Sequence, residues 1–509
     1  MSACTRRSFI EDSLFSAATL AASYGLWLPE TVRAQEGQEN QEENQEESVS
    51  PNEKLGVMIV GCGGRSADHI SAYLADDRVA ILYLCDPDSE RAESRADMVE
   101  QKAGYRPKVV ADLRDALGDP NLDVVSCASA NHWHALCGVW AMQAGKHAYI
   151  EKPICHNIHE GKALIACAKK YGVMCQVGSQ CRSNQALKDA FEFAKSGGIG
   201  EIKLTRGLCY KRRKSIGALG QYQVPETVDY NLWSGPAPIV DPPTRPNFHY
   251  DWHWQRLYGN GDLGNQGPHQ TDIARTFLGV DQFPTSVISY GGRLGYQAER
   301  GDDNYVDAGD TANTEVSIYN YADGKTLVFE TRGLETDDYR GAKIGVVAHG
   351  SEGYLVQIQY DYCAAFDKDM NMVKEFRGGG NHFRNFIDAV LNNDYASLNA
   401  DAHCGHLSAG LSHVGNISYY LGEDNKVSVR EGRKIIEDFA SVDDNLDTYQ
   451  RTIYHLVENG VNLEKYPISM GRVLKIDPAT DSFVDDPEAS KMETREYRDD
   501  FVVPDPDKV

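Results

Sequence analysis

The chain has 509 residues, of which 41% are hydrophobic and 25% charged, a composition typical of globular proteins with more than one domain. Its formal net charge of −24 disfavours nucleic acid and anionic membrane surfaces as partners. The sequence has 12 cysteines but no Cys-x-x-Cys pair and no His-Glu-x-x-His motif. We therefore expect free buried thiols rather than a disulfide framework, and no metal site.

Residues 1–34 resemble a twin-arginine export signal. Residues 5–10 (TRRSFI) carry the arginine pair, an apolar run follows at 14–28, and small residues near Ala34 suit cleavage. We expect export of the folded protein to the periplasm, with no membrane span left after removal of the signal. The alternative is an ordinary N-terminal helix of a cytoplasmic protein. Residues 35–54 are acidic and nearly without apolar side chains, which predicts a disordered linker.

Residues 55–180 predict a Rossmann domain, a doubly wound parallel sheet of the α/β class. An apolar run at 57–60 predicts a buried strand, and the glycine turn 61–65 (GCGGR) comes directly after it. The free N–H groups of the helix that follows favour the pyrophosphate of a dinucleotide. The next strand ends at Asp86, at the offset where a carboxylate meets the ribose hydroxyl. Because a carboxylate repels a 2′-phosphate, NAD is expected rather than NADP.

The alternation of strands and helices continues to about residue 177. Asp112 is expected to cap a short helix, and Asn131 to cap a helix over 132–144. A strand at 146–150 delivers Lys152 to the carboxyl edge of the sheet, where ligands of open α/β sheets bind. A lysine there can donate a hydrogen bond to a reacting oxygen and, when desolvated, exchange a proton. The alternative is a surface lysine held by Glu151.

Residues 259–272 form a second candidate site. Asn265 and His269 stand four residues apart and Asp272 three further on, so one helix face could present all three. Pro268 is tolerated only in a first helical turn, so Asn265 is expected on the loop before the helix. His269 is expected to transfer a proton, or else to be a buried structural histidine. Asp272 is expected to orient its imidazole or to cap the helix.

Residues 250–256 are dense in aromatic side chains. Trp252 and Trp254 could stack on the apolar face of a sugar ring or pack in the core, and the sequence leaves both open. Residues 211–214 (KRRK) are the one basic cluster and are interpreted as a solvated loop, with an anionic substrate group or a partner subunit as alternatives. Arg182 completes the candidate substrate residues, with Trp252 and Trp254.

Residues 181–422 predict an α+β domain with an open, mainly antiparallel sheet. Its expected strands are 201–210, 285–290, 313–319, 325–331 and 344–349. Helices are expected at 383–391 and 406–420. The remaining residues, 423–509, are acidic and weakly periodic, and the sequence assigns them no structure beyond a C-terminal extension.

Four motifs together resemble the Gfo/Idh/MocA oxidoreductases: 61–65 (GCGGR), 131–134 (NHWH), 144–147 (AGKH) and 151–153 (EKP). The resemblance runs from about Leu55 to Gly422. It implies a second domain whose open sheet meets the cofactor with one face and often forms an oligomer interface with the other, so a homo-oligomer is expected. It also implies an active-site carboxylate and histidine in the second site, where this chain has Asn265 and His269.

The expected cofactor-binding residues are Gly61, Cys62, Gly63, Gly64, Arg65, Asp86, Asn131, His134, Glu151 and Lys152. For His134, packing is as good an interpretation as contact with cofactor or substrate. The expected catalytic residues are Lys152, His269, Asn265 and Asp272.

The sequence therefore predicts an NAD(P)-dependent oxidoreductase, and the resemblance implies that it moves a hydride between nicotinamide and a sugar, cyclitol or glycoside. Lys152 and His269 would handle the hydroxyl proton. An exported enzyme cannot draw on the cytosolic nicotinamide pool, so the cofactor is expected to be tightly bound. One alternative is glycoside cleavage by oxidation and elimination, and another is a nucleotide-dependent binding or regulatory protein without turnover.

Overall fold

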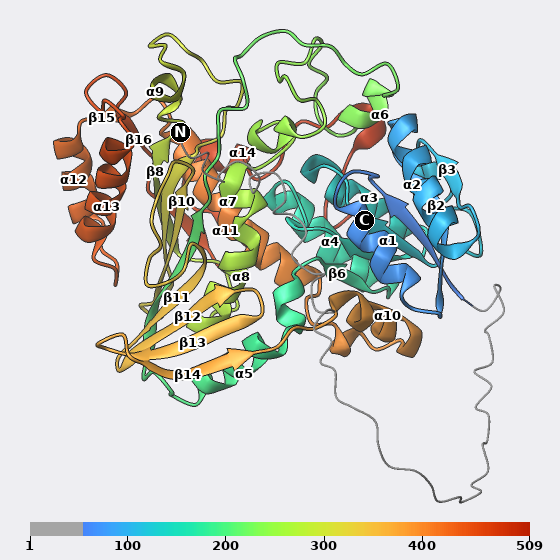
Figure 1. The fold of residues 1–509 in the computed structure, drawn as a ribbon, viewed down its shortest axis with the longest axis horizontal. Coiled ribbons are helices and arrows are strands. Elements are labelled where there is room, and N and C mark those ends of the chain that lie inside the picture. The colour runs from blue at the N-terminus through green and yellow to red at the C-terminus, as the bar shows by residue number, and fades with distance from the viewer. Residues whose placement is uncertain (1–53) are drawn as a thin grey trace, which may run out of the picture. The chain divides into compact units, whose positions relative to one another are not determined.

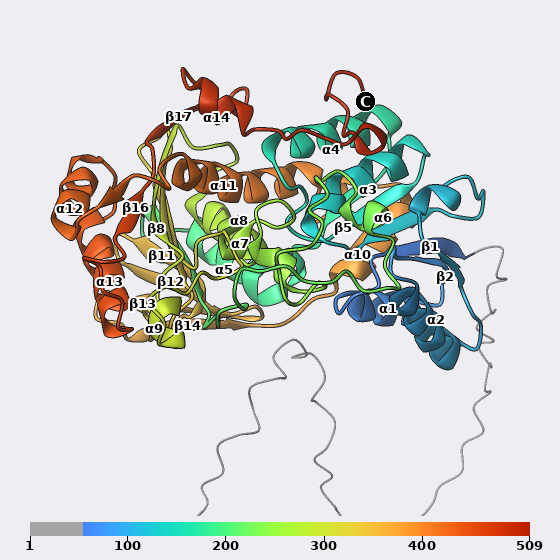
Figure 2. The same cartoon turned by 90° about the horizontal axis from the view of Figure 1, so that it is seen from above.

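The computed structural model describes residues 54–509 (Figures 1 and 2). The expected export signal at 1–34 lies outside the described residues, as does the expected linker apart from Lys54. Within residues 54–509, no helix is both long enough and apolar enough to cross a membrane.

The N-terminal domain is a doubly wound parallel sheet, as predicted. Within the described residues its strand order is β3-β2-β1-β4-β5-β6, and all pairs are parallel. The order reverses between β1 and β4, which opens a crevice at the carboxyl ends of these strands. The elements are β1 (Leu55–Val60), α1 (Ser66–Leu74), β2 (Val79–Cys85), α2 (Ser89–Ala103), β3 (Lys108–Val110), a 3-10 turn (Leu113–Asp115), β4 (Val124–Cys127), α3 (Asn131–Gln143), β5 (His147–Ile150), α4 (Ile158–Tyr171) and β6 (Cys175–Val177).

Helix caps in this domain agree with the sequence at one site and differ at another. The side chain of Asp112 accepts a hydrogen bond from the Arg114 N–H and starts the 3-10 turn, as expected. The expectation for Asn131 was wrong. Ala130 is the N-cap of α3 and Asn131 is its first helical residue, because the Asn131 side chain turns toward Asn260 (Nδ2 to Oδ1, 3.4 Å).

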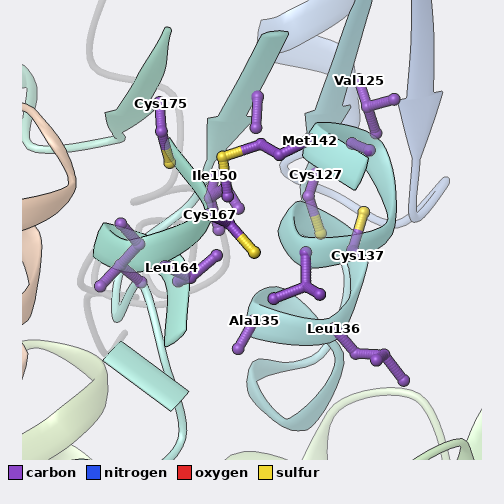
Figure 3. Close-up of a cluster of buried hydrophobic side chains, with 14 of the residues drawn as sticks. Val125, Cys127, Ala135, Leu136, Cys137, Met142, Ile150, Leu164, Cys167 and Cys175 are labelled. Atoms are coloured by element: carbon purple, nitrogen blue, oxygen red, sulfur yellow. The ribbon is translucent and has the colours of Figure 1, made fainter. Parts of the chain in front are cut away.

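A sulfur-rich core lies between β4, β5 and the helices α3 and α4 (Figure 3). Cys127 and Cys137 point toward each other there, beside Met142 and Ile150. All eleven cysteines among the described residues are buried and carry free thiols, in keeping with their apolar surroundings. Close packing of this kind fixes the strand ends that carry the candidate site.

The second domain is built on a twelve-stranded sheet within the described residues, and it is mainly antiparallel as predicted. One pair departs from this pattern, since β7 runs parallel to β10 and antiparallel to β11. Its elements up to residue 421 are a 3-10 turn (Gln180–Ser183), α5 (Gln185–Lys195), β7 (Ile202–Tyr210), α6 (Tyr230–Ser234), a 3-10 turn (Asp251–Trp254), α7 (Gly261–Asn265), α8 (Gly267–Leu278), β8 (Ser286–Gly292), α9 (Tyr296–Arg300), β9 (Thr314–Asn320), β10 (Thr326–Arg332), β11 (Ile344–Gly350), β12 (Gly353–Gln359), β13 (Tyr362–Asp367), β14 (Met372–Arg377), α10 (His382–Asn392), a 3-10 turn (Tyr395–Ser397) and α11 (Ala402–Leu421).

Helix α10 returns from this domain to the Rossmann sheet (Figure 1). Its Phe383 stacks on Tyr149 of β5 with ring centroids 4.7 Å apart, and Phe386 meets the same ring edge-on. Helix α11 packs along α8 on the inner face of the large sheet and also contacts α4. Helices α10 and α11 therefore each contact the Rossmann domain as well as pack within the second domain. This packing fixes the position of one domain against the other.

The extension, residues 423–509, is folded, although its sequence gave no assignment. Its elements are β15 (Lys426–Val427), α12 (Val429–Asp438), α13 (Asn445–Glu458), β16 (Ile468–Met470), β17 (Leu474–Asp477), β18 (Ser482–Phe483), α14 (Pro487–Lys491) and a 3-10 turn (Asp499–Phe501). Strand β16 pairs with β8, and α12 and α13 lie on the sheet face opposite α8 (Figure 2).

Helices α12 and α13 bury the outer face of the sheet. Ile436 and Leu456 from these helices share an apolar cluster with Ile288 and Val328 of the strands. Part of the face that the resemblance implied for an oligomer interface is thus covered by the chain itself.

Candidate active site

The glycine turn after β1 forms an open cradle. Gly61 has a positive φ of 87°, and a Cβ there would come within 2.5 Å of the Ser129 main chain, so a larger residue is excluded. A Cβ on Gly64 would meet nothing within 4 Å, and one on Gly63 only the Arg91 guanidinium at 3.4 Å. The cradle opens into a cavity of ≈ 500 Å³ lined by Cys62, Gly63, Gly64, Asp88, Glu90, Arg91, Ser94, Arg95 and His249.

The carboxylate of Asp86 stabilises the glycine turn through hydrogen bonds to main-chain N–H groups. Its carboxylate accepts hydrogen bonds from the Cys62 N–H at 2.6 Å and from the Asp88 N–H at 2.8 Å. The residue is 9% exposed, and burial raises the pKa of its carboxyl to about 6. The side chain therefore fixes the shape of the cradle, and its contact with a ribose stays a prediction.

Arg65 and Glu151 join the two sides of the crevice. Arg65 Nε donates to Glu151 Oε1 at 2.7 Å, and His69 Nε2 lies 3.2 Å from the same oxygen. Burial opposes ionisation of Glu151, but the charge of Arg65 prevails and holds its pKa well below the ordinary value. Sequence reasoning missed His69; its place four residues after Arg65, on the same face of α1, was the available signal.

These groups fit a dinucleotide. Arg65 Nη2 is buried and has no hydrogen-bond partner among residues 54–509, so it can donate to an added anion. The N-terminus of α1 begins at the open cradle, where free N–H groups favour phosphate. A bound nicotinamide would supply the hydride donor or acceptor. Residues 54–509 contain no cluster of three His, Cys, Asp or Glu side chains suited to a metal ion.

Lys152 lies at the end of β5 and faces the second domain. Its Nζ donates a hydrogen bond to the main-chain oxygen of Asn265 at 2.9 Å. Burial lowers the pKa of Lys152 to about 8; the Glu151 carboxylate opposes this shift, and the nearby guanidinium of Arg65 adds to it. A lysine with this pKa exchanges protons readily near neutral pH.

His269 lies four residues after Asn265, in the first turn of α8. It is 5% exposed, its ring lies against Tyr360 with centroids 5.3 Å apart, and its Nδ1 has no hydrogen-bond partner within the described residues. Burial, followed by the charge of Lys152, lowers the pKa of His269 to about 3. The Lys152 ammonium is thus near enough to lower the pKa of His269 further, and burial favours the neutral imidazole.

Asn265 is not on a loop, contrary to the expectation from Pro268. It is the last residue of the short helix α7, and Gln266 separates this helix from α8. Pro268 does lie in the first turn of α8, where its missing N–H costs no helical hydrogen bond.

Asp272 neither orients His269 nor caps the helix. Arg182 donates to both of its oxygens, from Nε at 2.7 Å and from Nη2 at 3.0 Å, and the Ser408 hydroxyl donates at 2.7 Å. The N-cap of α8 is Gln266, so Asp272 is an interior residue that ties α8 to α11. From the sequence, Arg182 was expected to contact the substrate, but its guanidinium is engaged in this buried ion pair with Asp272.

Trp252 and Trp254 are packed rather than open. They are 9% and 5% exposed. His253 stacks on Trp252 with centroids 3.7 Å apart, and the Arg213 guanidinium lies 5.2 Å from the Trp254 ring centroid. Arg213 also pairs with the buried Asp262 at 2.7 Å, so this member of the basic cluster is not in a solvated loop.

His253 was missed by sequence reasoning. Burial lowers its pKa to about 3, and the charges of Lys152 and Arg213 contribute, which places the imidazole in the electrostatic field of the site. Its only sequence signal was its position between two tryptophans. His134 is a packing residue, because Nδ1 lies 2.6 Å from the Pro153 oxygen and Nε2 3.0 Å from the Ser129 oxygen.

A Rossmann sheet with an open glycine cradle, facing a lysine of lowered pKa, defines a nicotinamide-dependent oxidoreductase. Residues 55–179 match the oxidoreductase family described as "NAD-binding Rossmann fold", and residues 205–456 match its "C-terminal alpha/beta domain". The chain belongs to the Gfo/Idh/MocA family of oxidoreductases.

Two curated relatives illustrate the range of similarity. Levoglucosan dehydrogenase of Pseudarthrobacter phenanthrenivorans is 27% identical over 321 residues, which are 60% of this chain and 73% of the relative. Inositol 2-dehydrogenase of Salmonella typhimurium is 27% identical over 177 residues, which are 34% of this chain and 50% of the relative.

Solved structures share the fold. The WlbA dehydrogenase from Bordetella pertussis, in complex with NADH and UDP-GlcNAcA, has a TM-score of 0.51 at 20% identity, with 70% of this chain and 94% of that chain covered. GenD2 from gentamicin A biosynthesis, in complex with NAD, has a TM-score of 0.52 at 18% identity, with 71% and 93% covered.

Proposed function

We propose that the protein transfers a hydride between NAD and a carbon bearing a hydroxyl or carbonyl group on a sugar, cyclitol or glycoside. Relatives named for levoglucosan and inositol support the substrate class. The aromatic packing around Trp252 and Trp254 gives no independent support for a sugar platform.

The contact between Lys152 and the Asn265 carbonyl carries the proposal. It holds an ammonium group with a pKa of about 8 beside the helix that bears His269. Lys152 would take the hydroxyl proton during oxidation and return it during reduction. His269, with a pKa of about 3, would stay neutral and orient the substrate hydroxyl by a hydrogen bond. This division differs from the sequence-based expectation that His269 transfers a proton.

The choice of NAD rests on Asp86, whose carboxylate at the end of β2 would repel a 2′-phosphate. Two structural relatives described with NADH and NAD support it. Arg91 and Arg95 line the same cavity and would favour an extra phosphate, so binding of both nucleotides must be compared. We expect the bound cofactor to be held tightly.

The proposal includes export by the twin-arginine route, supported by the TRRSFI motif at 5–10 and the apolar run after it. That route carries folded proteins, which suits an enzyme that is loaded with its nucleotide before export. Fractionation of cells should place the processed protein in the periplasm, and a cytoplasmic, unprocessed protein would contradict this part.

The proposal also includes association of copies of the chain. The interface would lie away from the part of the sheet that α12 and α13 cover. Light scattering of the purified protein measures the assembly, and a monomer at all concentrations would contradict it.

The test of function begins with a mass spectrum of nucleotide that co-purifies with the protein. Keto-sugars, cyclitols and glycosides are then screened for changes in bound NADH absorbance. Oxidised product together with NADH supports the proposal. Released aglycone without net NADH would instead indicate cleavage by oxidation and elimination, and nucleotide binding without any turnover would indicate a binding protein.

A further inference from the structure

A long segment of the second domain crosses to the nucleotide-binding domain. Residues 211–260, here called the crossing segment, leave β7 and return at α7 (Figure 1). Along the way they form α6, which lies beside the helices of the Rossmann sheet. The segment therefore connects the sheet domain to the region where a dinucleotide would bind.

The crossing segment pairs with the turn between β2 and α2, which borders the cavity at the glycine cradle. The contacts are antiparallel in direction and involve main-chain atoms, so they do not depend on particular side chains. They are Asp229 N–H to Pro87 O at 2.8 Å, Ser89 N–H to Thr227 O at 3.1 Å, and a bridge between Asp88 and Val228.

His249 adds a side-chain contact at the same place. Its Nε2 lies 3.1 Å from Asp88 Oδ2, and its side chain is 21% exposed. Burial, followed by the charge of Arg91, lowers the pKa of His249 to about 4, so at neutral pH the imidazole is uncharged and donates a hydrogen bond to the carboxylate. His249 lines the cavity together with Gly63 and Arg91. One wall of the nucleotide cavity thus comes from the second domain.

The outer side of the crossing segment is held by the C-terminal extension. Arg498 donates to the main-chain oxygens of Asn231 and Gly235, each at 3.0 Å. Arg495 donates to the Leu257 oxygen at 2.9 Å. The segment is therefore fixed between the extension and the cavity rim.

We propose that the crossing segment is a retaining strap, which forms one wall of the cavity along the ribose and phosphate side of a bound dinucleotide. The proposal rests on the proposed function. The cavity of ≈ 500 Å³ is large enough for a mononucleotide half, and Arg91 and Arg95 in its wall complement phosphate. Release of the nucleotide requires the contacts between Asp88 and His249, and the main-chain pairing beside them, to open together. The strap would slow the exchange of the bound nucleotide with free nucleotide.

The dissociation rate of NADH tests the strap. The protein is loaded with NADH, and release is followed by loss of energy transfer from tryptophan after addition of excess NAD. His249→Ala should raise the rate about tenfold, the value of one lost hydrogen bond to a charged group. Asp88→Asn keeps a side chain that can cap α2 but removes the charge that accepts the hydrogen bond of His249. This variant should therefore also raise the dissociation rate. His403→Ala, an exposed histidine on α11, should leave the rate unchanged.

The outcomes separate the two levels of the proposal. If NADH binds to both variants and dissociates from them at the wild-type rate, the strap proposal is wrong and the proposed function still stands. Protein that binds neither NAD nor NADH would overturn both. Circular dichroism of each variant confirms that a faster rate does not arise from unfolding.

Discussion

The Nζ of Lys152 donates to the main-chain oxygen of Asn265 at 2.9 Å, across a separation of 113 residues. This single hydrogen bond joins the end of a Rossmann strand to the end of α7 in the second domain. It sets the position of the ammonium group relative to α8, on which His269 lies four residues after Asn265. The chemistry of the site therefore depends on how the two domains meet.

Replacement of Lys152 by alanine should lower kcat/KM by at least about 10²-fold, the usual effect of losing a positioned proton-transfer group. NADH affinity, measured by fluorescence titration, should stay within about twofold, because the cradle at 61–64 is untouched. Lys146→Ala is the matched control: Lys146 lies just before the other end of β5 and donates to the Asp119 oxygen. Full activity of Lys152→Ala would remove this residue from the mechanism.

The rate of oxidation should depend on pH through Lys152. Its pKa of about 8 means that the ammonium form, which cannot accept a proton, dominates below pH 8. Log(kcat/KM) for oxidation should therefore rise with a slope near one up to about pH 8 and then level off. His269, with a pKa of about 3, contributes no step above pH 5. A profile with its break near pH 6.5 would point to a histidine instead.

Glu315→Gln should stabilise the protein at neutral and alkaline pH. Glu315 is 2% exposed, its Oε1 has no hydrogen-bond partner among residues 54–509, and burial raises its pKa to about 8. The folded state thus holds a proton that the unfolded state loses above about pH 4.5, so this group lowers stability progressively between pH 4.5 and 8. The gain in the free energy of unfolding should be on the order of 4 kcal/mol at pH 8 and vanish near pH 4.

Urea unfolding at pH 4, 6 and 8 measures that dependence. Glu335→Gln, at an exposed position, should change stability by less than about 0.5 kcal/mol at every pH. A Glu315→Gln gain that does not grow with pH would show that Glu315 is not protonated in the folded state.

Glu330→Gln should destabilise the protein by about 3 kcal/mol or more, since it removes the buried carboxylate that the guanidinium groups of Arg206, Arg332 and Arg451 share. Glu330 accepts from Arg206 at 2.5 Å, from Arg332 at 3.0 Å and, on α13, from Arg451 at 2.9 Å. Limited proteolysis should then cut α12 and α13 faster, because their attachment to the sheet is weakened. Glu375→Gln, on the exposed strand β14, serves as the control, and equal proteolysis of both variants would contradict the covering role of α13.

Much of the nucleotide-binding half could be predicted from the sequence because its signals are local. The apolar run of β1, the glycines at 61–64 and the cap at Asp112 each act on neighbouring residues. The strand ends that carry Asp86 and Lys152 follow from counting along such elements. Asn131 shows where this reasoning fails, since its side chain serves a tertiary contact with Asn260 instead of the cap.

The second half of the site was decided by the tertiary structure. Spacing predicted that Asn265, His269 and Asp272 share one helix face, but Asn265 ends α7 and Asp272 is paired with Arg182. Spacing also could not show that the charge of Lys152 would act on His253. Nor could weak periodicity show that 423–509 would cover the large sheet. By itself the sequence determined a Rossmann cradle with a lysine at its edge. Only the folded chain decided the partners of each charge, because burial makes an unpaired charge costly and the available partners lie far apart in sequence.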